Sequence, residues 1–234
     1  MGSKFEMKPE LMNERARVYG FLSRIFREEL DKVFLGHMKK GLRQLDSGSV
    51  ELVQSYHRLK KFLDPIKIDD ELMEDLASDY ADLFLAVGQN PAHPYESVYI
   101  GGDGILMGEP RNEVITLFRR EMIRRVEWFK EPEDHVAIEL EFMAYLCIKA
   151  NANFGKKCSA GWEQGIRLQL AFLEQHLIKW LPAFCADILK CPLKRDFYHI
   201  IAQFTEAYMF FDQEALRNCV PGASLGHQAE EKLP

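Results

Sequence analysis

Helical periodicity of the apolar residues is the feature that most constrains this chain. Apolar residues recur three and four positions apart along most of its length, and the strict alternation typical of strands is almost absent. One example is the stripe that contains Leu72, Leu76 and Val87. The sequence therefore predicts an all-α protein, with no sheet of three or more strands between residues 10 and 212.

Proline, glycine and short polar runs divide this pattern into separate helices. We expect a single helical domain of about nine to eleven helices over residues 1–218, followed by a flexible tail over 219–234. The expected helices follow Pro9, cover about 31–45, 50–63 and 69–87, follow Pro110 and Pro132, and cover 160–181, with shorter helices after Pro182 and Pro192.

One long segment does not follow the helical pattern. Residues 88–110 read GQNPAHPYESVYIGGDGILMGEP, which is rich in glycine and proline but also contains many apolar side chains. A long loop inside a compact domain is usually functional or disordered, and this one is too apolar for disorder. We expect it to pack against the body of the protein, where it bridges two helical subdomains or forms part of a groove wall.

Charge and composition exclude several classes of protein. The formal net charge of −6 argues against a sequence-independent nucleic-acid binder and fits a cationic partner better. Five cysteines without a CxxC pair fit neither a disulfide framework nor a zinc ribbon. The N-terminus lacks the apolar core of a signal peptide, and no apolar run approaches the roughly 18 residues of a membrane span. We expect a cytoplasmic protein without an integral membrane segment.

Residues 131–143 read EPEDHVAIELEFM and place ionisable groups on an otherwise apolar helix. We expect this helix to start at Glu131 and Pro132, so that Asp134 lies at the positive end of the helix dipole and the dipole keeps His135 neutral. His135 and Glu139 are four positions apart and share a face of that helix. They fit a buried structural pair or a pair of metal ligands, while Asp134 and His135 could act as an acid–base pair.

Motifs that would decide for an enzyme are absent from the sequence. There is no HExxH pair, P-loop, GxGxxG or GxSxG, and GGDG at 101–104 fits a plain turn. The sequence therefore predicts no catalytic residue, no metal site and no resident cofactor. The alternative is a helical metal-dependent hydrolase that uses Asp134, His135 and Glu139.

The helix near 70–87 also allows two interpretations. Asp75, Asp79 and Asp82 line its polar side, either as a solvated face or as an acidic strip for arginines of a bound peptide. On its other side lie three large residues, which fit either the core or the floor of a peptide groove: Tyr80, Leu83 and Phe84.

Three blocks in this order resemble the TorD/DmsD/NarJ family of molybdoenzyme maturation chaperones. The first block, DYADLFLAVGQNPAHPYESVY at 79–99, carries the resemblance through Tyr80, Leu83, Phe84, Gly88, Pro94, Tyr95, Ser97 and Tyr99. The second is EPEDHVAIELEFM, through Glu131, Pro132, Asp134, His135, Glu139, Leu140 and Met143. The third is HLIKWLPAF at 176–184, through His176, Leu177, Trp180, Pro182 and Phe184.

The resemblance implies an all-helical chaperone rather than an enzyme. It would bind the twin-arginine signal peptide and the apo form of a DMSO-reductase-type molybdenum enzyme, support cofactor insertion and deter premature export. No motif supports contact with molybdopterin or guanine nucleotide, and the chain is expected to be a monomer or a helix-exchanged homodimer. The predicted client-binding residues are Tyr80, Leu83, Phe84, Pro94, Tyr95, Ser97, Tyr99, Glu131, Pro132, Asp134, His135 and Glu139, with Asp75, Asp79 and Asp82 as contacts of the leader arginines.

Overall fold

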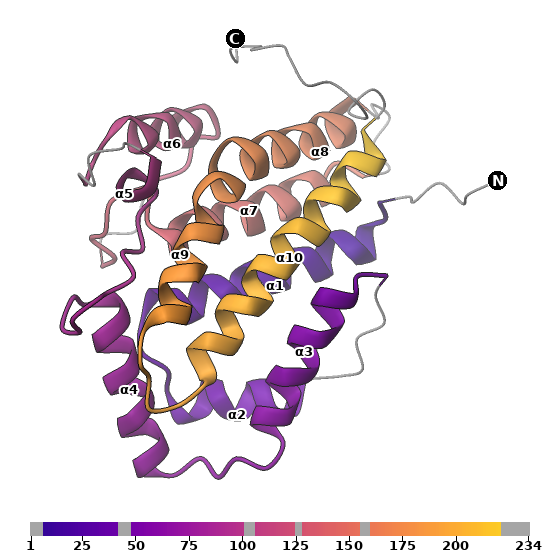
Figure 1. The fold of residues 1–234 in the computed structure, drawn as a ribbon. Helices are drawn as coiled ribbons and strands as arrows, with labels where there is room; N and C mark the ends of the chain where they lie inside the picture. The colour runs from indigo at the N-terminus through magenta and orange to yellow at the C-terminus, as the bar shows by residue number, and fades with distance from the viewer. Residues whose placement is uncertain (1–6, 42–47, 101–105, 125–127, 155–159, 221–234) are drawn as a thin grey trace.

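The computed structural model describes residues 7–41, 48–100, 106–124, 128–154 and 160–220, and its regular elements in these ranges are all helices (Figure 1). They are α1 (Pro9–Arg27), α2 (Lys32–Gly41), α3 (Val50–Leu63), α4 (Asp70–Phe84), α5 (Glu96–Ile100), α6 (Glu109–Arg120), α7 (Val136–Asn151), α8 (Ala160–Phe172), the π-helical turn η1 (Leu173–Leu177), α9 (Ile178–Lys190) and α10 (Phe197–Cys219). The predicted all-α fold is confirmed. The predicted tail lies outside the described residues from 221 onward.

Local sequence signals account for several helix starts. Ser49 precedes α3 and accepts a hydrogen bond from the Leu52 N–H at 3.2 Å. Asp69 precedes α4 and accepts one from the Leu72 N–H at 3.1 Å. Both side chains satisfy a backbone donor that has no partner within its helix.

Two helices organise the core. Helix α7 is buried around most of its girth and packs along α1 and against α8. Helix α10 packs against α3, α8 and α9 (Figure 1). Because both helices are covered on several sides, their sequences carry apolar residues on more than one face.

A buried ionic network ties the first and last helices together. The Arg15 guanidinium on α1 pairs with Asp212 on α10 through Nε–Oδ1 and Nη2–Oδ2 distances of 2.5 and 2.8 Å. Tyr19 donates to Asp212 at 2.6 Å, and Arg15 also donates to Gln169 on α8 at 2.5 Å. The bidentate geometry and the Tyr19 donor satisfy the Asp212 carboxylate, which is completely buried.

The helix after residue 160 differs from the prediction. Elements α8, η1 and α9 follow one another without a break, so the chain stays helical through Pro182 to Lys190. The prediction of short helices after Pro182 and Pro192 is wrong, since α10 alone has 23 residues. Proline lacks the N–H of a normal helical residue, and the burial of Trp180, Leu181 and Phe184 stabilises the helix around it.

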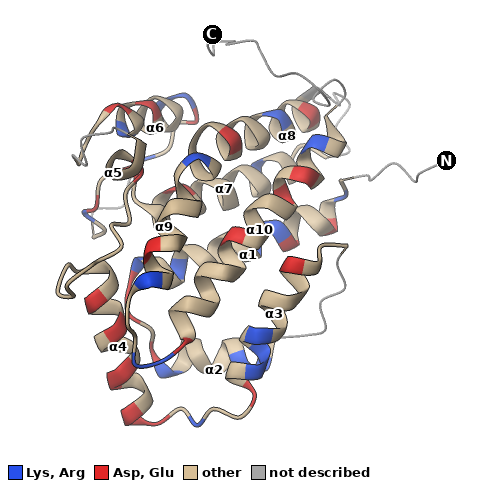
Figure 2. Cartoon of the chain, in the orientation of Figure 1, with Lys and Arg blue, Asp and Glu red and all other residues tan. Residues whose placement is uncertain are grey.

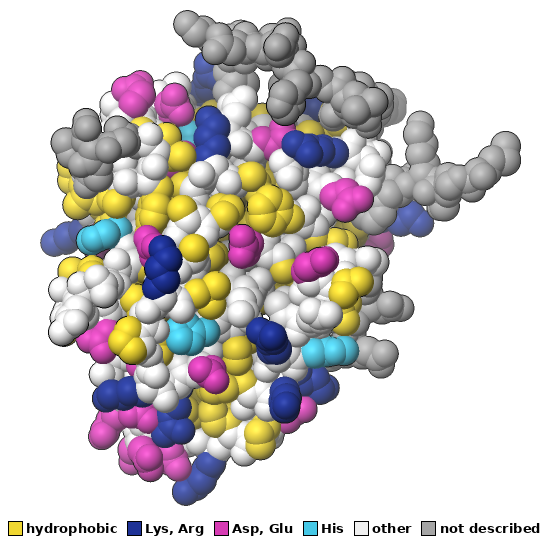
Figure 3. All heavy atoms as spheres, viewed as in Figure 1, with side chains coloured by type: hydrophobic (Ala, Val, Ile, Leu, Met, Phe, Trp, Pro, Cys, Tyr) yellow, Lys and Arg dark blue, Asp and Glu magenta, His cyan; other side chains and the backbone are white. Residues whose placement is uncertain are grey.

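Segment 88–110 is not one continuous loop. It contains α5 and the start of α6, while residues 101–105 lie outside the described ranges. No helix in the described parts of the chain is long and apolar enough to cross a membrane. On the face seen in Figures 2 and 3, positive and negative side chains are interspersed among apolar ones, and acidic positions follow α4 along its length.

Candidate functional site

The EPEDH segment forms a turn rather than the first turn of a helix. Helix α7 begins at Val136, and His135 is its N-cap, whose Nδ1 accepts a hydrogen bond from the Ala137 N–H at 3.1 Å. The predicted helix start at Glu131 and Pro132 is therefore too early. The imidazole supplies the acceptor that the helix N-terminus needs, so the helix starts after it.

This turn is joined to the first block by main-chain hydrogen bonds. Tyr95 and His135 form an isolated antiparallel bridge. The Glu96 N–H donates to the Asp134 carbonyl at 3.0 Å, and the Val136 N–H donates to the Pro94 carbonyl at 2.8 Å. These two blocks, which are far apart in sequence, therefore lie side by side.

Asp134 holds the start of α5 through its side chain. Its Oδ2 accepts from the Ser97 N–H at 3.0 Å and also from the Ser97 hydroxyl. The Ser97 Oγ in turn accepts from the Gly108 N–H at 3.0 Å. Asp134 and Ser97 are both completely buried, so this clamp fixes the start of α5 and the position of Gly108 from inside.

His135 is neutral in this environment. Burial lowers its pKa from 6.5 to about 3. Its ring lies between Tyr95 and Phe129, with ring centroids 5.2 and 5.4 Å away. The predicted direction agrees with the structure, but the cause is burial rather than the helix dipole.

Glu139 does not share a site with Asp134 and His135. The Trp180 Nε1–H donates to its Oε2 at 3.0 Å, while its Oε1 has no hydrogen-bond partner. Burial, followed by the charge of Glu96 nearby, raises the pKa of Glu139 well above its usual range. The triad of the alternative hydrolase is therefore not assembled, because its three side chains face different partners.

Instead, folding gathers Glu139 with residues that were not on the predicted site list. The His176 Nδ1 lies 2.9 Å from Oε2 of Glu96, and both side chains are buried. This contact and the hydrogen bond from Trp180 to Glu139 place the third block, 176–184, against the first block, 79–99, and the second, 131–143. The four-residue spacing of His176 and Trp180 was the available signal, since it places both on one side of a helix.

The predicted groove floor is part of the core. Tyr80, Leu83 and Phe84 are buried, and the Phe84 ring packs against Phe184 and Tyr198 with centroid distances of 6.0 and 5.6 Å. These side chains do not line an open groove, because α9 and α10 cover them.

The predicted acidic strip is largely occupied within the chain. Asp79 is buried and accepts from the Lys194 and Arg195 N–H groups at 2.8 and 2.9 Å. Asp75 pairs with the Arg195 side chain at 2.7 Å. Both carboxylates hold the connection between α9 and α10, so neither lies on a solvated face. Asp82 is half-buried.

An apolar hollow of about 250 Å³ lies beside the EPEDH turn. Phe129, which contacts His135, lines it, and Trp128 at its edge is 62% exposed. The Arg27 guanidinium lies over the Trp128 ring, 5.3 Å from its centroid. Its lining residues are Arg27, Phe118, Ile123, Arg124, Trp128, Phe129, Ile138, Glu141, Phe142 and Tyr145.

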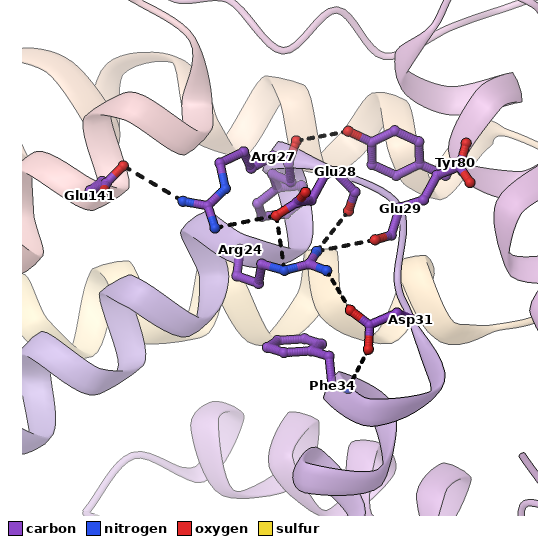
Figure 4. A network of polar contacts seen from close by, with 9 residues as sticks. Arg24, Arg27, Glu28, Glu29, Asp31, Phe34, Tyr80 and Glu141 are labelled. Atoms are coloured by element: carbon purple, nitrogen blue, oxygen red, sulfur yellow. Dashed lines mark hydrogen bonds and ion pairs between the residues drawn. The ribbon is translucent and has the colours of Figure 1, made fainter. Parts of the chain in front are cut away.

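An acidic rim adjoins this hollow at the end of α1. Figure 4 shows Arg27 between Glu141 and Glu28, and Arg24 reaching Glu28 and Asp31. The Tyr80 hydroxyl donates to the Phe26 carbonyl at 3.3 Å.

The pKa of the Tyr80 hydroxyl is affected by the negative charge of this rim. Burial, followed by the charges of Glu29, Glu131 and Glu28, raises its pKa well above the usual range. We define the acidic rim as Glu28, Glu29 and Glu131, the three carboxylates whose charge contributes to the raised pKa of Tyr80.

Comparisons with known proteins show which protein family this chain is similar to. A family model described as nitrate reductase delta subunit matches residues 46–186. The chaperone protein TorD of Vibrio cholerae is 33% identical over 180 residues, which cover 75% of this chain and 80% of that protein. The chaperone protein TorD of Vibrio vulnificus is 28% identical over 211 residues, covering 87% and 94%. A crystal structure from Archaeoglobus fulgidus, described as a redox enzyme maturation protein, aligns with a TM-score of 0.45 and 18% identity over 84% of this chain and 93% of that one.

Proposed function

The chain belongs to the TorD/DmsD/NarJ family of molybdoenzyme maturation chaperones, and from this premise we propose that it binds the twin-arginine leader and the apo form of a DMSO-reductase-type molybdoenzyme. Binding of the apo form supports cofactor insertion and deters premature export. The protein acts by recognition rather than catalysis. Because an enzyme awaiting export is still in the cytoplasm, the chaperone is cytoplasmic too.

The observation that carries this proposal is the apolar hollow with an acidic rim beside it. A twin-arginine leader presents two guanidinium groups followed by an apolar segment. Glu28 and Glu29 are exposed at the end of α1, and carboxylates form directional, charge-assisted hydrogen bonds with arginine. The hollow next to them offers aromatic surface for the apolar segment.

The residues predicted from the sequence have two roles in this proposal. Four half-buried side chains contact the client: Tyr95, Tyr99, Glu131 and Pro132. Buried side chains position that surface from below: Tyr80, Leu83, Phe84, Pro94, Ser97, Asp134, His135 and Glu139. Asp82 is kept as an outlying contact for a leader arginine.

Calorimetric titration with a synthetic twin-arginine leader tests the proposal. We expect Trp128→Ala to lower the affinity about tenfold, or by about 1.4 kcal/mol, because tryptophan is enriched among the few residues that carry most of the binding energy of an interface. The matched control is Val50→Ala on α3, which is 61% exposed and is not among the lining residues of the hollow. Equal affinity of wild type and folded Trp128→Ala would contradict the proposal.

The charge of the leader provides a second arm of the same experiment. A leader with both arginines replaced by lysines should bind more weakly, since lysine cannot form a bidentate pair with a carboxylate. Raising the salt concentration from about 0.05 to 0.5 M should weaken binding of the arginine leader, because exposed charges are screened over a few ångströms at high salt. Binding that depends on neither change would remove the acidic rim from the site.

A further inference from the structure

Three buried side chains converge where the three sequence blocks meet. Glu96 on α5, Glu139 on α7 and His176 on η1 each offer one oxygen or nitrogen atom, and these atoms lie within 4.8 Å of one another. Their side chains are 1, 0 and 2% exposed. Carboxylate oxygen and imidazole nitrogen are ligands of first-row divalent metal ions.

The cluster brings two carboxyl groups within 4.8 Å of one another, with the His176 imidazole as its basic group. The Trp180 N–H satisfies one oxygen of Glu139, but the completely buried Oε1 has no donor. A carboxylate beside a second carboxylate in a low-dielectric interior requires a positive charge, either a proton or a metal ion. The unpartnered Oε1 is therefore available to a proton shared with Glu96 or to a bound metal ion.

The distance between the His176 nitrogen and the Glu96 oxygen already suits two ligands of one ion. Two ligands that are each 2.0–2.1 Å from Zn²⁺ lie roughly 2.9–3.4 Å apart at bond angles near 90–110°. The His176 Nδ1 and Glu96 Oε2 are 2.9 Å apart. His176 also lies in a π-helical turn, a local distortion that occurs frequently at functional sites.

We propose that Glu96, Glu139 and His176 bind one divalent transition-metal ion of the Zn²⁺ class. The three protein ligands leave a fourth position for water, and the ion replaces the hydrogen bond between His176 and Glu96. Its role is structural, since it joins α5, α7 and the π-helical turn at a buried point. The site does not depend on the nature of the client.

Metal titration of the full chain tests this site. After dialysis against a chelator, wild-type protein should bind one Zn²⁺ in calorimetry, and Co²⁺ should give visible d–d absorption. At a Zn²⁺ concentration about 100 times the Kd, the Tm should rise by roughly 5–10 °C. Failure of wild type to bind stoichiometric Zn²⁺ or Co²⁺ would overturn the proposal.

Glu139→Gln separates the metal from a shared proton. The amide oxygen keeps an acceptor for Trp180, and its NH₂ can donate to Glu96, so this variant should fold without metal. We expect at least a 100-fold loss of Zn²⁺ affinity and no Tm response. Glu163→Gln, an exposed carboxylate on α8, is the matched control and should bind as wild type does. Equal Zn²⁺ binding by Glu139→Gln would refute the site and leave a shared proton as the bridging charge.

Discussion

Removal of the Asp134 side chain is the sharpest test of how the EPEDH turn works. The sequence alone predicts that this residue acts in recognition, so that Asp134→Ala leaves a folded protein and lowers leader affinity. Its burial and its two contacts with Ser97 indicate the opposite order. We expect the free energy of unfolding to fall, and the leader affinity to fall only in proportion to the unfolded fraction.

The size of the effect follows from the donors that lose their acceptor. In Asp134→Ala the Ser97 N–H and hydroxyl lose their shared carboxylate oxygen inside the protein. A buried donor without a partner costs about 1–3 kcal/mol, so two cost about 2–6 kcal/mol. For a chain of this length a 4 kcal/mol loss lowers the Tm by roughly 8–16 °C.

Urea unfolding followed by circular dichroism measures this loss, and Ser97→Ala completes a double-mutant cycle. Ser97→Ala should lose less than Asp134→Ala, and the double variant should lose less than the sum because both changes remove the same contact. Asp64→Ala, an exposed acidic residue at the end of α3, is the control and should stay within about 0.5 kcal/mol of wild type. A folded Asp134→Ala of unchanged stability but reduced leader affinity would refute this reasoning and restore the direct recognition role.

Three further predictions concern buried groups elsewhere. Asp212→Asn leaves Arg15 charged and poorly compensated, so urea unfolding should show a loss of about 3–5 kcal/mol, against little change for exposed Asp196→Asn; a loss below about 1 kcal/mol contradicts this. His135 has a folded pKa of about 3 against 6.5 when unfolded, so the unfolded state binds more protons between these values. Its contribution is fully present above pH 6.5 and falls by up to about 1.4 kcal/mol per pH unit toward pH 3; an unchanged pH slope in His135→Asn would contradict the assignment. Burial raises the pKa of the Cys147 thiol to about 12, so iodoacetamide at about pH 8 should modify it in urea but hardly in the native protein, as peptide mass spectrometry will show; rapid native labelling would contradict its burial.

Helix type and several helix starts could be predicted because their signals are local or patterned. Apolar spacing reports the buried face of a helix, and Ser49 and Asp69 mark the starts of α3 and α4. The predicted client-binding residues come from two blocks of sequence, and the antiparallel bridge between Tyr95 and His135 joins these blocks.

Several features required tertiary partners that the sequence does not display. The partners of Asp79 are the N–H groups of residues 194 and 195, more than 100 positions away. Pro182 suggests a helix end, but the burial of its neighbours keeps the helix intact. The grouping of Glu139 with His176 likewise depends on how α7 and η1 pack, which no local pattern encodes.

The clamp between Ser97 and Asp134 also has a consequence for the chain that lies between them. These residues are 37 positions apart, and their contact closes that stretch into an excursion whose two ends are fixed side by side. Helix α6 belongs to this excursion and is held by its own contact with the bundle, since the Phe118 ring packs against Phe142 on α7 with a centroid distance of 4.9 Å. Loop-closure entropy grows only slowly with length, by about 0.6 kcal/mol for each doubling. Folding should therefore tolerate insertions between the helices of the excursion better than an insertion of one residue at either anchor, which would separate the two ends.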